Sequence, residues 1–199
     1  MLDSPLLRYV LRMRTRKKVI EIVAASLGVL ALAGCVQPPP RVIPTSEPSM
    51  APVFASDADA LAAAKKAFTG YLLASDSIAH SGGVNVDPLV DLDSPNQFAR
   101  DKKTFATLHA ASEHTSGQSS YSHFTLQSNE STGRGLVEIV AYACIDISNT
   151  QLLDAGGNLI NSSRPSGAPL VLTFKNATSG SKSLVLDGSV TWQGQDFCS

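Results

Sequence analysis

The chain has 199 residues, which fits one globular domain with appended segments rather than two full domains. Its charge is unevenly placed: six of the 16 Lys and Arg residues lie at positions 1–18, whereas positions 35–199 carry 10 basic and 15 acidic residues. A mildly acidic body without a basic patch argues against nucleic-acid binding, and a mean hydropathy of +0.05 excludes a polytopic membrane protein.

The first 34 residues have the features of an export signal. The basic stretch precedes an apolar run over 19–33, which is interrupted only by Glu21 and Ser26. The run is shorter than the roughly 20 residues that a membrane-spanning helix needs, and small residues follow it. We therefore predict a signal peptide over residues 1–34. The alternative is a core helix or a signal anchor that happens to end in a cysteine.

The four residues Leu32-Ala33-Gly34-Cys35 resemble a bacterial lipobox. In exported proteins of that kind the cysteine thiol receives a diacylglyceryl group, and cleavage before the cysteine makes it the new amino terminus. Two acyl chains hold a protein stably at a membrane, whereas one chain alone is marginal. The resemblance therefore implies lipidation of Cys35 and a mature chain anchored on the extracytoplasmic face of the cell membrane.

Residues 35–55, beginning with the lipidated cysteine, form the predicted linker. Six of the 11 prolines lie within 36–55. Proline fixes φ and lacks a backbone donor, so neither a helix nor a central strand is available to this segment. We predict an extended spacer that packs on nothing, followed by a folded domain over residues 56–199.

The first half of the domain has helical patterns. Ser56 is the predicted N-cap of a long helix that ends at Gly82-Gly83, a short helix follows Pro88, and Ser94-Pro95 starts another helix that reaches about residue 112. In the first helix, positions spaced three and four residues apart form the predicted inward face. They are Leu61, Ala64, Phe68, Tyr71, Leu72, Ser75 and Ile78.

The second half has strand patterns. Strands are predicted over 121–126, 136–148, 170–175 and 184–192, with a turn at 154–158. In the strand 136–148, alternate residues form an apolar face of Val137, Ile139, Ala141, Ala143, Ile145 and Ile147. Helices followed by strands indicate an α+β fold with helices packed on one face of an antiparallel sheet.

Three cysteines are present, and removing Cys35 as the lipid carrier leaves Cys144 and Cys198. An even pair in an oxidising compartment is compatible with a disulfide. Two separate buried thiols are the alternative.

Three segments resemble NTF2-like domains in lipoproteins of high-GC Gram-positive bacteria, an uncharacterised family. They are Ala63 to Gly83, Tyr142-Ala143-Cys144-Ile145-Asp146-Ile147-Ser148, and the terminal Trp192-Gln193-Gly194-Gln195-Asp196-Phe197-Cys198. The family fold is a cone, in which a curved antiparallel sheet wraps around helices and leaves an open mouth. The resemblance implies this fold and a disulfide between Cys144 and Cys198.

Motifs for metal or cofactor chemistry are weak. His109, Glu113 and His114 read HxxxEH, whereas metal-binding helices use HExxH or HxxEH with both histidines on one face. We interpret the motif as a solvated helix end, with a metal site as the alternative. The sequence predicts no metal and no cofactor.

The strongest candidate for a pocket is the strand face that carries Tyr142 and Asp146. Catalytic NTF2-like enzymes of the ketosteroid-isomerase kind place an Asp and a Tyr in the cone, where the carboxylate accepts a carbon-bound proton and the phenol stabilises the enolate. The alternative is that Asp146 bonds to backbone or to a nearby lysine and that Tyr142 is a core residue. No catalytic residue of the family can be carried over by position.

The leading hypothesis is a non-catalytic module of the cell envelope that binds an envelope protein or a small ligand. The alternative is a small-molecule enzyme that uses the cone pocket. The cone mouth distinguishes them: a mouth filled by aliphatic side chains favours a protein-binding surface, and an open pocket with a desolvated Asp146 favours the enzyme.

Overall fold

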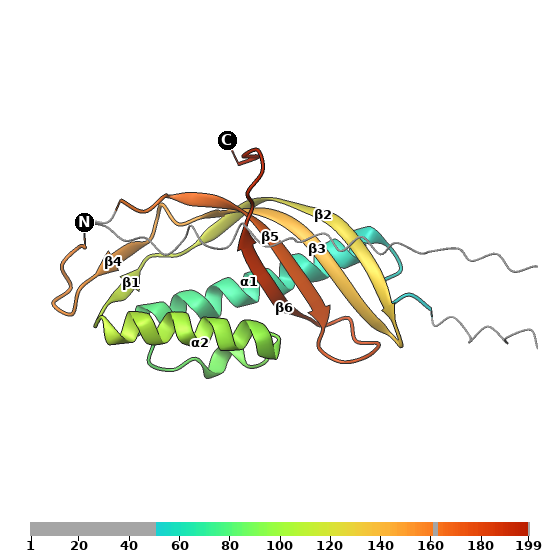
Figure 1. Ribbon diagram of the computed structural model, residues 1–199, viewed down its shortest axis with the longest axis horizontal. Coiled ribbons are helices and arrows are strands. Elements are labelled where there is room, and N and C mark those ends of the chain that lie inside the picture. The colour runs from blue at the N-terminus through green and yellow to red at the C-terminus, as the bar shows by residue number, and fades with distance from the viewer. Residues whose placement is uncertain (1–50, 161–162, 199) are drawn as a thin grey trace, which may run out of the picture. The chain divides into compact units, whose positions relative to one another are not determined.

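The structure is a computed structural model that describes residues 51–160 and 163–198. The predicted signal peptide over 1–34, the predicted lipidation site Cys35 and the predicted linker up to residue 50 lie outside the described residues. None of the described helices is long and apolar enough to cross a membrane. Figure 1 shows helices on one side of a curved antiparallel sheet, and the carboxyl-terminal segment on the other.

The predicted starts of the two long helices are confirmed, whereas the short helix starts at Asp87, before the predicted Pro88. α1 spans Asp57–His80, and the Oγ of its N-cap Ser56 accepts a hydrogen bond from the Asp59 amide at 3.1 Å. The short helix η2 spans Asp87–Leu89. α2 spans Pro95–Ala110 behind the N-cap Ser94, and it ends slightly before the predicted residue 112.

A glycine is required where the chain leaves α1. Gly83 has a φ of +73°, and a Cβ at this position would collide with the carbonyl oxygen of Phe105 on α2. The Gly82-Gly83 pair therefore ends the helix and also lets α1 and α2 approach closely.

The main sheet has four antiparallel strands in the order β2-β3-β5-β6. β2 spans Ser120–Gly133, β3 spans Leu136–Asp146, β5 spans Gly167–Asn176 and β6 spans Leu184–Thr191. The sheet is open, with β2 and β6 as its edges. The structure thus confirms an α+β fold with helices on an antiparallel sheet.

A second, two-stranded sheet was not predicted. β1, His114–Ser116, pairs with β4, Gln151–Leu153, in antiparallel register. Each strand has three residues, too few for an alternating pattern to stand out in the sequence.

The two faces of the main sheet follow the alternation in β3. Val137, Ile139, Ala141 and Ala143 are buried against the helices, and we call this side the inner face. The residues between them, including Tyr142, are half-buried and lie on the outer face. The predicted apolar face of this strand is therefore the one that meets α1.

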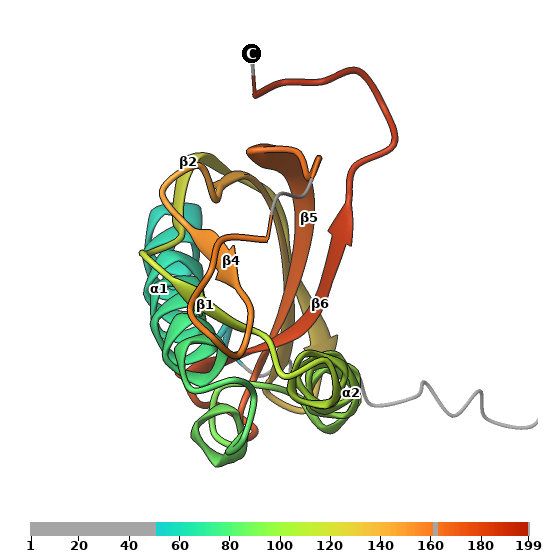
Figure 2. The same ribbon diagram turned by 90° about the vertical axis from the view of Figure 1, so that its left-hand side faces the viewer.

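Aromatic rings join α1 to the inner face. Phe68 of α1 has its ring centroid 5.1 Å from that of Tyr121 and 5.9 Å from that of Phe124, both on β2. Phe124 reaches on to Phe174 of β5, at 6.3 Å. Figure 2 shows α1 running along this face and α2 lying beside one end of β6.

The prediction that the linker packs on nothing is wrong for its last residues. Phe54 is only 4% exposed and belongs to the same core as Phe68, and Val53 packs against it. Proline content predicts an extended backbone, but it does not prevent a neighbouring aromatic side chain from entering a core. The folded domain therefore begins before Ser56.

We expect Phe54→Ala to lower the free energy of unfolding by about 3 kcal/mol, because truncating a buried phenylalanine leaves a cavity. Pro52→Ala, at an exposed position of the same segment, should have no measurable effect. Urea denaturation of both variants beside the wild-type chain measures the difference. Equal stability of Phe54→Ala and wild type would show that this segment does not contribute to the core.

Candidate functional site

The inner side of the sheet, where a cone mouth was expected, is filled with side chains. Phe68 of α1, Ile139 of β3 and Leu172 and Phe174 of β5 are all fully or almost fully buried there. These side chains are apolar, so they offer neither a polar pocket nor a titratable group. A ligand site is therefore better sought on the outer face.

Tyr142 lies on the outer face, where it packs against the carboxyl-terminal segment 192–198. Its ring centroid is 5.1 Å from that of Trp192 and 5.4 Å from that of Phe197, and the Phe197 ring is stacked on it. The Trp192 indole N–H donates to the carbonyl of Gln195 at 3.1 Å. Tyr142 therefore anchors the segment instead of lining an inner cavity.

Asp146 also lies on the outer face, four residues further along β3 and hence about 13 Å from Tyr142. Its Oδ1 accepts a hydrogen bond from the Ser148 amide at 2.8 Å, and this bond lowers the pKa of the carboxyl group. A carboxylate with a lowered pKa is a weak proton acceptor. Asp146 is thus bonded to backbone, as the simpler alternative had it, and is not desolvated.

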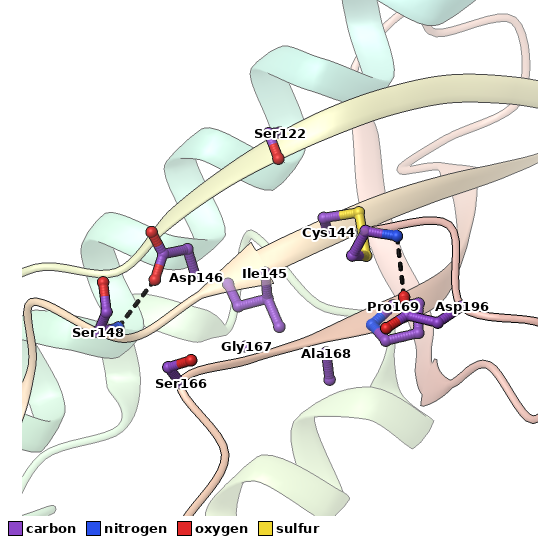
Figure 3. A pocket seen from close by; sticks show the side chains of 11 residues that line it. Ser122, Cys144, Ile145, Asp146, Ser148, Ser166, Gly167, Ala168, Pro169 and Asp196 are labelled. Atoms are coloured by element: carbon purple, nitrogen blue, oxygen red, sulfur yellow. Dashed lines mark hydrogen bonds between the residues drawn. A yellow bond between two sulfur atoms is a disulfide. The ribbon is translucent and has the colours of Figure 1, made fainter.

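A hollow of about 480 Å³ lies on the outer face, between the ends of β3 and β5 and the segment 192–198 (Figure 3). Two carboxylates line it, Asp146 and Asp196, and each accepts a backbone N–H, from Ser148 and Cys198 respectively. The hydroxyl-bearing residues of its lining are Ser122, Ser148 and Ser166. The hollow is therefore rich in fixed hydrogen-bond acceptors.

A disulfide between Cys144 and Cys198 forms one wall of this hollow. Their Cα atoms are 5.5 Å apart, and Cys144 lies on the outer face of β3 beside Tyr142. This is the pairing that the resemblance implies. The bond holds the carboxyl-terminal segment against the sheet, so the shape of the hollow is covalently constrained.

The predicted HxxxEH residues line a different hollow, of about 380 Å³, at the ends of α1 and α2. His80 lies there together with His109, Glu113 and His114. His80 Nε2 is 2.6 Å from the Gly117 carbonyl oxygen, and His109 Nδ1 is 3.2 Å from that of Gly82. Two of the rings are thus engaged with backbone. Among the described residues, no group of three or more His, Cys, Asp or Glu side chains could hold a metal ion.

A buried carboxyl pair, Asp93 and Asp101, was missed in the sequence. The two residues are 5% and 9% exposed. Asp93 lies just before α2 and Asp101 lies within it, where the sequence indicated only a helix start at Ser94-Pro95. A signal existed, because Asp93 lies between the apolar Leu92 and the Ser94-Pro95 cap, but sequence alone does not show that this stretch runs along a strand.

Comparisons with known proteins leave the family open. No protein-family model and no curated protein matches the chain. Among solved structures, it is similar to the intermembrane space region of the chloroplast protein ARC6, at 7% identity and a TM-score of 0.48, over 66% of this chain and 95% of that one. It is also similar to a periplasmic fragment of TraM, at 12% identity and a TM-score of 0.40, over 69% and 98%. Neither likeness is strong enough to transfer a function.

We expect Cys198→Ser to release the carboxyl-terminal segment. On the chain-entropy model, a disulfide that closes a span of 54 residues contributes about 4 kcal/mol to stability. The variant should lose most of this, and the emission of Trp192, the single tryptophan, should shift to longer wavelength. Dithiothreitol should produce both changes in the wild type and neither in the variant. An unchanged emission maximum would contradict the packing of Trp192 on Tyr142.

Proposed function

We propose that the chain is a lipid-anchored module of the cell envelope that binds a partner protein through the outer face of its sheet, and that it is not an enzyme. One observation carries this proposal: apolar side chains fill the inner side of the sheet, while the outer face leaves apolar side chains in contact with solvent. A filled interior offers no place for a small substrate, whereas exposed apolar side chains suit a protein surface.

The outer row crosses three strands. Tyr142, Val171 and Val190 are register partners across β3, β5 and β6, so their side chains share one face. Tyr142 is covered by the carboxyl-terminal segment and Val171 is half-buried, whereas Val190, on the edge strand, is 62% exposed. The row borders the acidic, hydroxyl-lined hollow beside the disulfide. An apolar strip next to fixed polar groups has the composition of a protein-binding surface, with an apolar centre and a polar rim.

The extracytoplasmic location belongs to the same proposal. It is supported by the lipobox that ends in Cys35 and by the disulfide, since structural disulfides persist in oxidising compartments. The NTF2-like assignment is likewise proposed. Helices on one face of a curved, open antiparallel sheet and the Cys144–Cys198 bond support it.

The alternative, a small-molecule enzyme, has little support. The residues it would use, Tyr142 and Asp146, lie on the outer face, and neither is placed to act on a substrate together with the other. The lowered pKa of Asp146 makes it a poor base.

Lipidation is tested at Cys35. We expect intact-mass analysis of the membrane fraction to show a diacylglyceryl adduct on a chain that begins at Cys35, and we expect Cys35→Ala to abolish the adduct. Cys198→Ser is the matched control, because it removes a different cysteine and should keep the lipid. An unmodified wild-type chain in the cytosol would overturn the anchored part of the proposal.

The binding face is tested by photo-crosslinking in cells. With a benzoylphenylalanine residue in place of Val190, we expect a discrete adduct with another protein, because this side chain projects from the outer row. Lys102, exposed on α2, is the control position and should give none. The absence of an adduct at 190, or the same adduct from both positions, would contradict binding through the outer face.

A further inference from the structure

The chain segment that precedes α2 closes one part of the β6 edge. We call residues Leu92–Ser94 the edge segment. The Ser94 amide donates to the Leu186 carbonyl, and the Leu186 amide donates to the Leu92 carbonyl, both at 2.8 Å. Asp93 thereby forms a parallel bridge with Leu186. Beside it, Arg100 Nη2 of α2 donates to the Asp187 carbonyl at 2.7 Å.

This arrangement buries the Asp93 carboxyl group. Among the described residues, no N–H or O–H group donates to either of its oxygens. The polar group next to it is the second carboxyl group, that of Asp101. An ionised carboxylate without partners is costly in such a place, whereas a neutral carboxyl group is not. Asp93 therefore needs a proton or a positive charge close to it.

Burial and the charge of Asp101 raise the pKa of the Asp93 carboxyl group by more than the positive charge of the nearby Arg100 lowers it. Among the groups around Asp93, Tyr71 comes from α1, and Asp101 and Arg100 come from α2. The Arg100 Nη2 is already engaged, since it donates to the Gln97 side-chain oxygen at 2.6 Å as well as to the backbone of β6.

The remaining neighbours are also occupied. On β6, the Asp187 carboxylate is paired with Lys175 Nζ at 2.7 Å. The Gln97 amide nitrogen donates to Asp101 Oδ2 at 2.9 Å, and among the described residues it makes no hydrogen bond to Asp93. Two carboxyl groups in contact can be accommodated when they share one proton.

We propose that Asp93 and Asp101 share one proton, and that this proton holds the edge segment and the start of α2 against β6, so that its loss loosens this corner of the domain. The carboxyl pair would make the attachment of the edge segment to β6 sensitive to pH. The inference does not depend on the proposed binding function, because it concerns the opposite end of β6 from the disulfide.

The sign of the effect follows from the titration of Asp93. Burial, and next the charge of Asp101, raise the pKa of Asp93 from 3.8 to about 8. Burial and Asp101 also raise the pKa of Tyr71, which keeps this phenol neutral. Between pH 4 and 8 the folded state thus holds a proton that the unfolded state has released. The free energy of unfolding falls through this range as pH rises, and the fall ends above the folded-state pKa.

Amide hydrogen exchange of the wild-type domain tests the proposal directly. After correction for the intrinsic pH dependence of exchange, the Ser94 and Leu186 amides should exchange at least tenfold faster at pH 9 than at pH 6. The Ala141 amide, in the middle of the sheet, should change much less. Equal acceleration at all three positions, or none, would overturn the local loosening.

Two substitutions assign the effect to the carboxyl pair. Asp93→Asn resembles the protonated acid in shape and should remove the pH dependence, with a melting temperature above that of wild type at pH 8. Asp91→Asn, an exposed neighbour, should behave as wild type. If Asp93→Asn does not fold, Asp101→Asn should flatten the dependence instead. A wild-type slope in the Asp93→Asn variant would refute the shared proton. The shared proton would also be refuted if Ca²⁺ raised the melting temperature of the wild type but not of the Asp93→Asn variant, because this would indicate a cation bound at the carboxyl pair.

Discussion

The seating of Phe68 on the inner face of the sheet is the contact on which the rest of the structure depends. Its ring is buried between Tyr121 and Phe124 and brings α1 onto the strands. Successive side chains of a strand point to opposite faces. Because Ile139 and Ala141 share the core with Phe68, Tyr142 must lie on the other face of the sheet. A filled interior and the outer face that we propose for binding are therefore two consequences of one packing arrangement.

An open sheet of four strands also has to protect its edges, and the two edges do so differently. β2 has register shifts at three places along its pairing with β3, and His123 within it has a positive φ. Such irregularities prevent regular pairing with another strand. β6 is instead covered by another part of the chain, the edge segment at Leu186. Beyond Thr191, the Trp192 amide donates to the Pro169 carbonyl and extends the pairing with β5.

Local signals in the sequence were sufficient for the helix caps at Ser56 and Ser94 and for the apolar face of β3, because these features depend on neighbouring residues. The alternation also placed Tyr142 opposite the apolar row, so its outward position could have been inferred. Contacts between distant parts of the chain were not visible. Phe54 follows a proline-rich stretch, and Asp93 is buried only because its backbone pairs with Leu186, a residue far along the chain.

The edge strand β6 is thus held at its two ends by different chemistry. Near its start, backbone hydrogen bonds from the edge segment depend on a carboxyl pair that is neutral enough to stay buried. Beyond its end, the Cys144–Cys198 bond holds the segment that covers Tyr142. An apolar side chain in place of Asp93 would avoid the free-energy cost of burying a carboxyl group. The presence of Asp93 at this position therefore argues against a purely structural role for this residue. Val190 lies between these two attachment points, on the exposed stretch of β6. A conformational change at either end of β6 would therefore be transmitted along the strand to the proposed binding row.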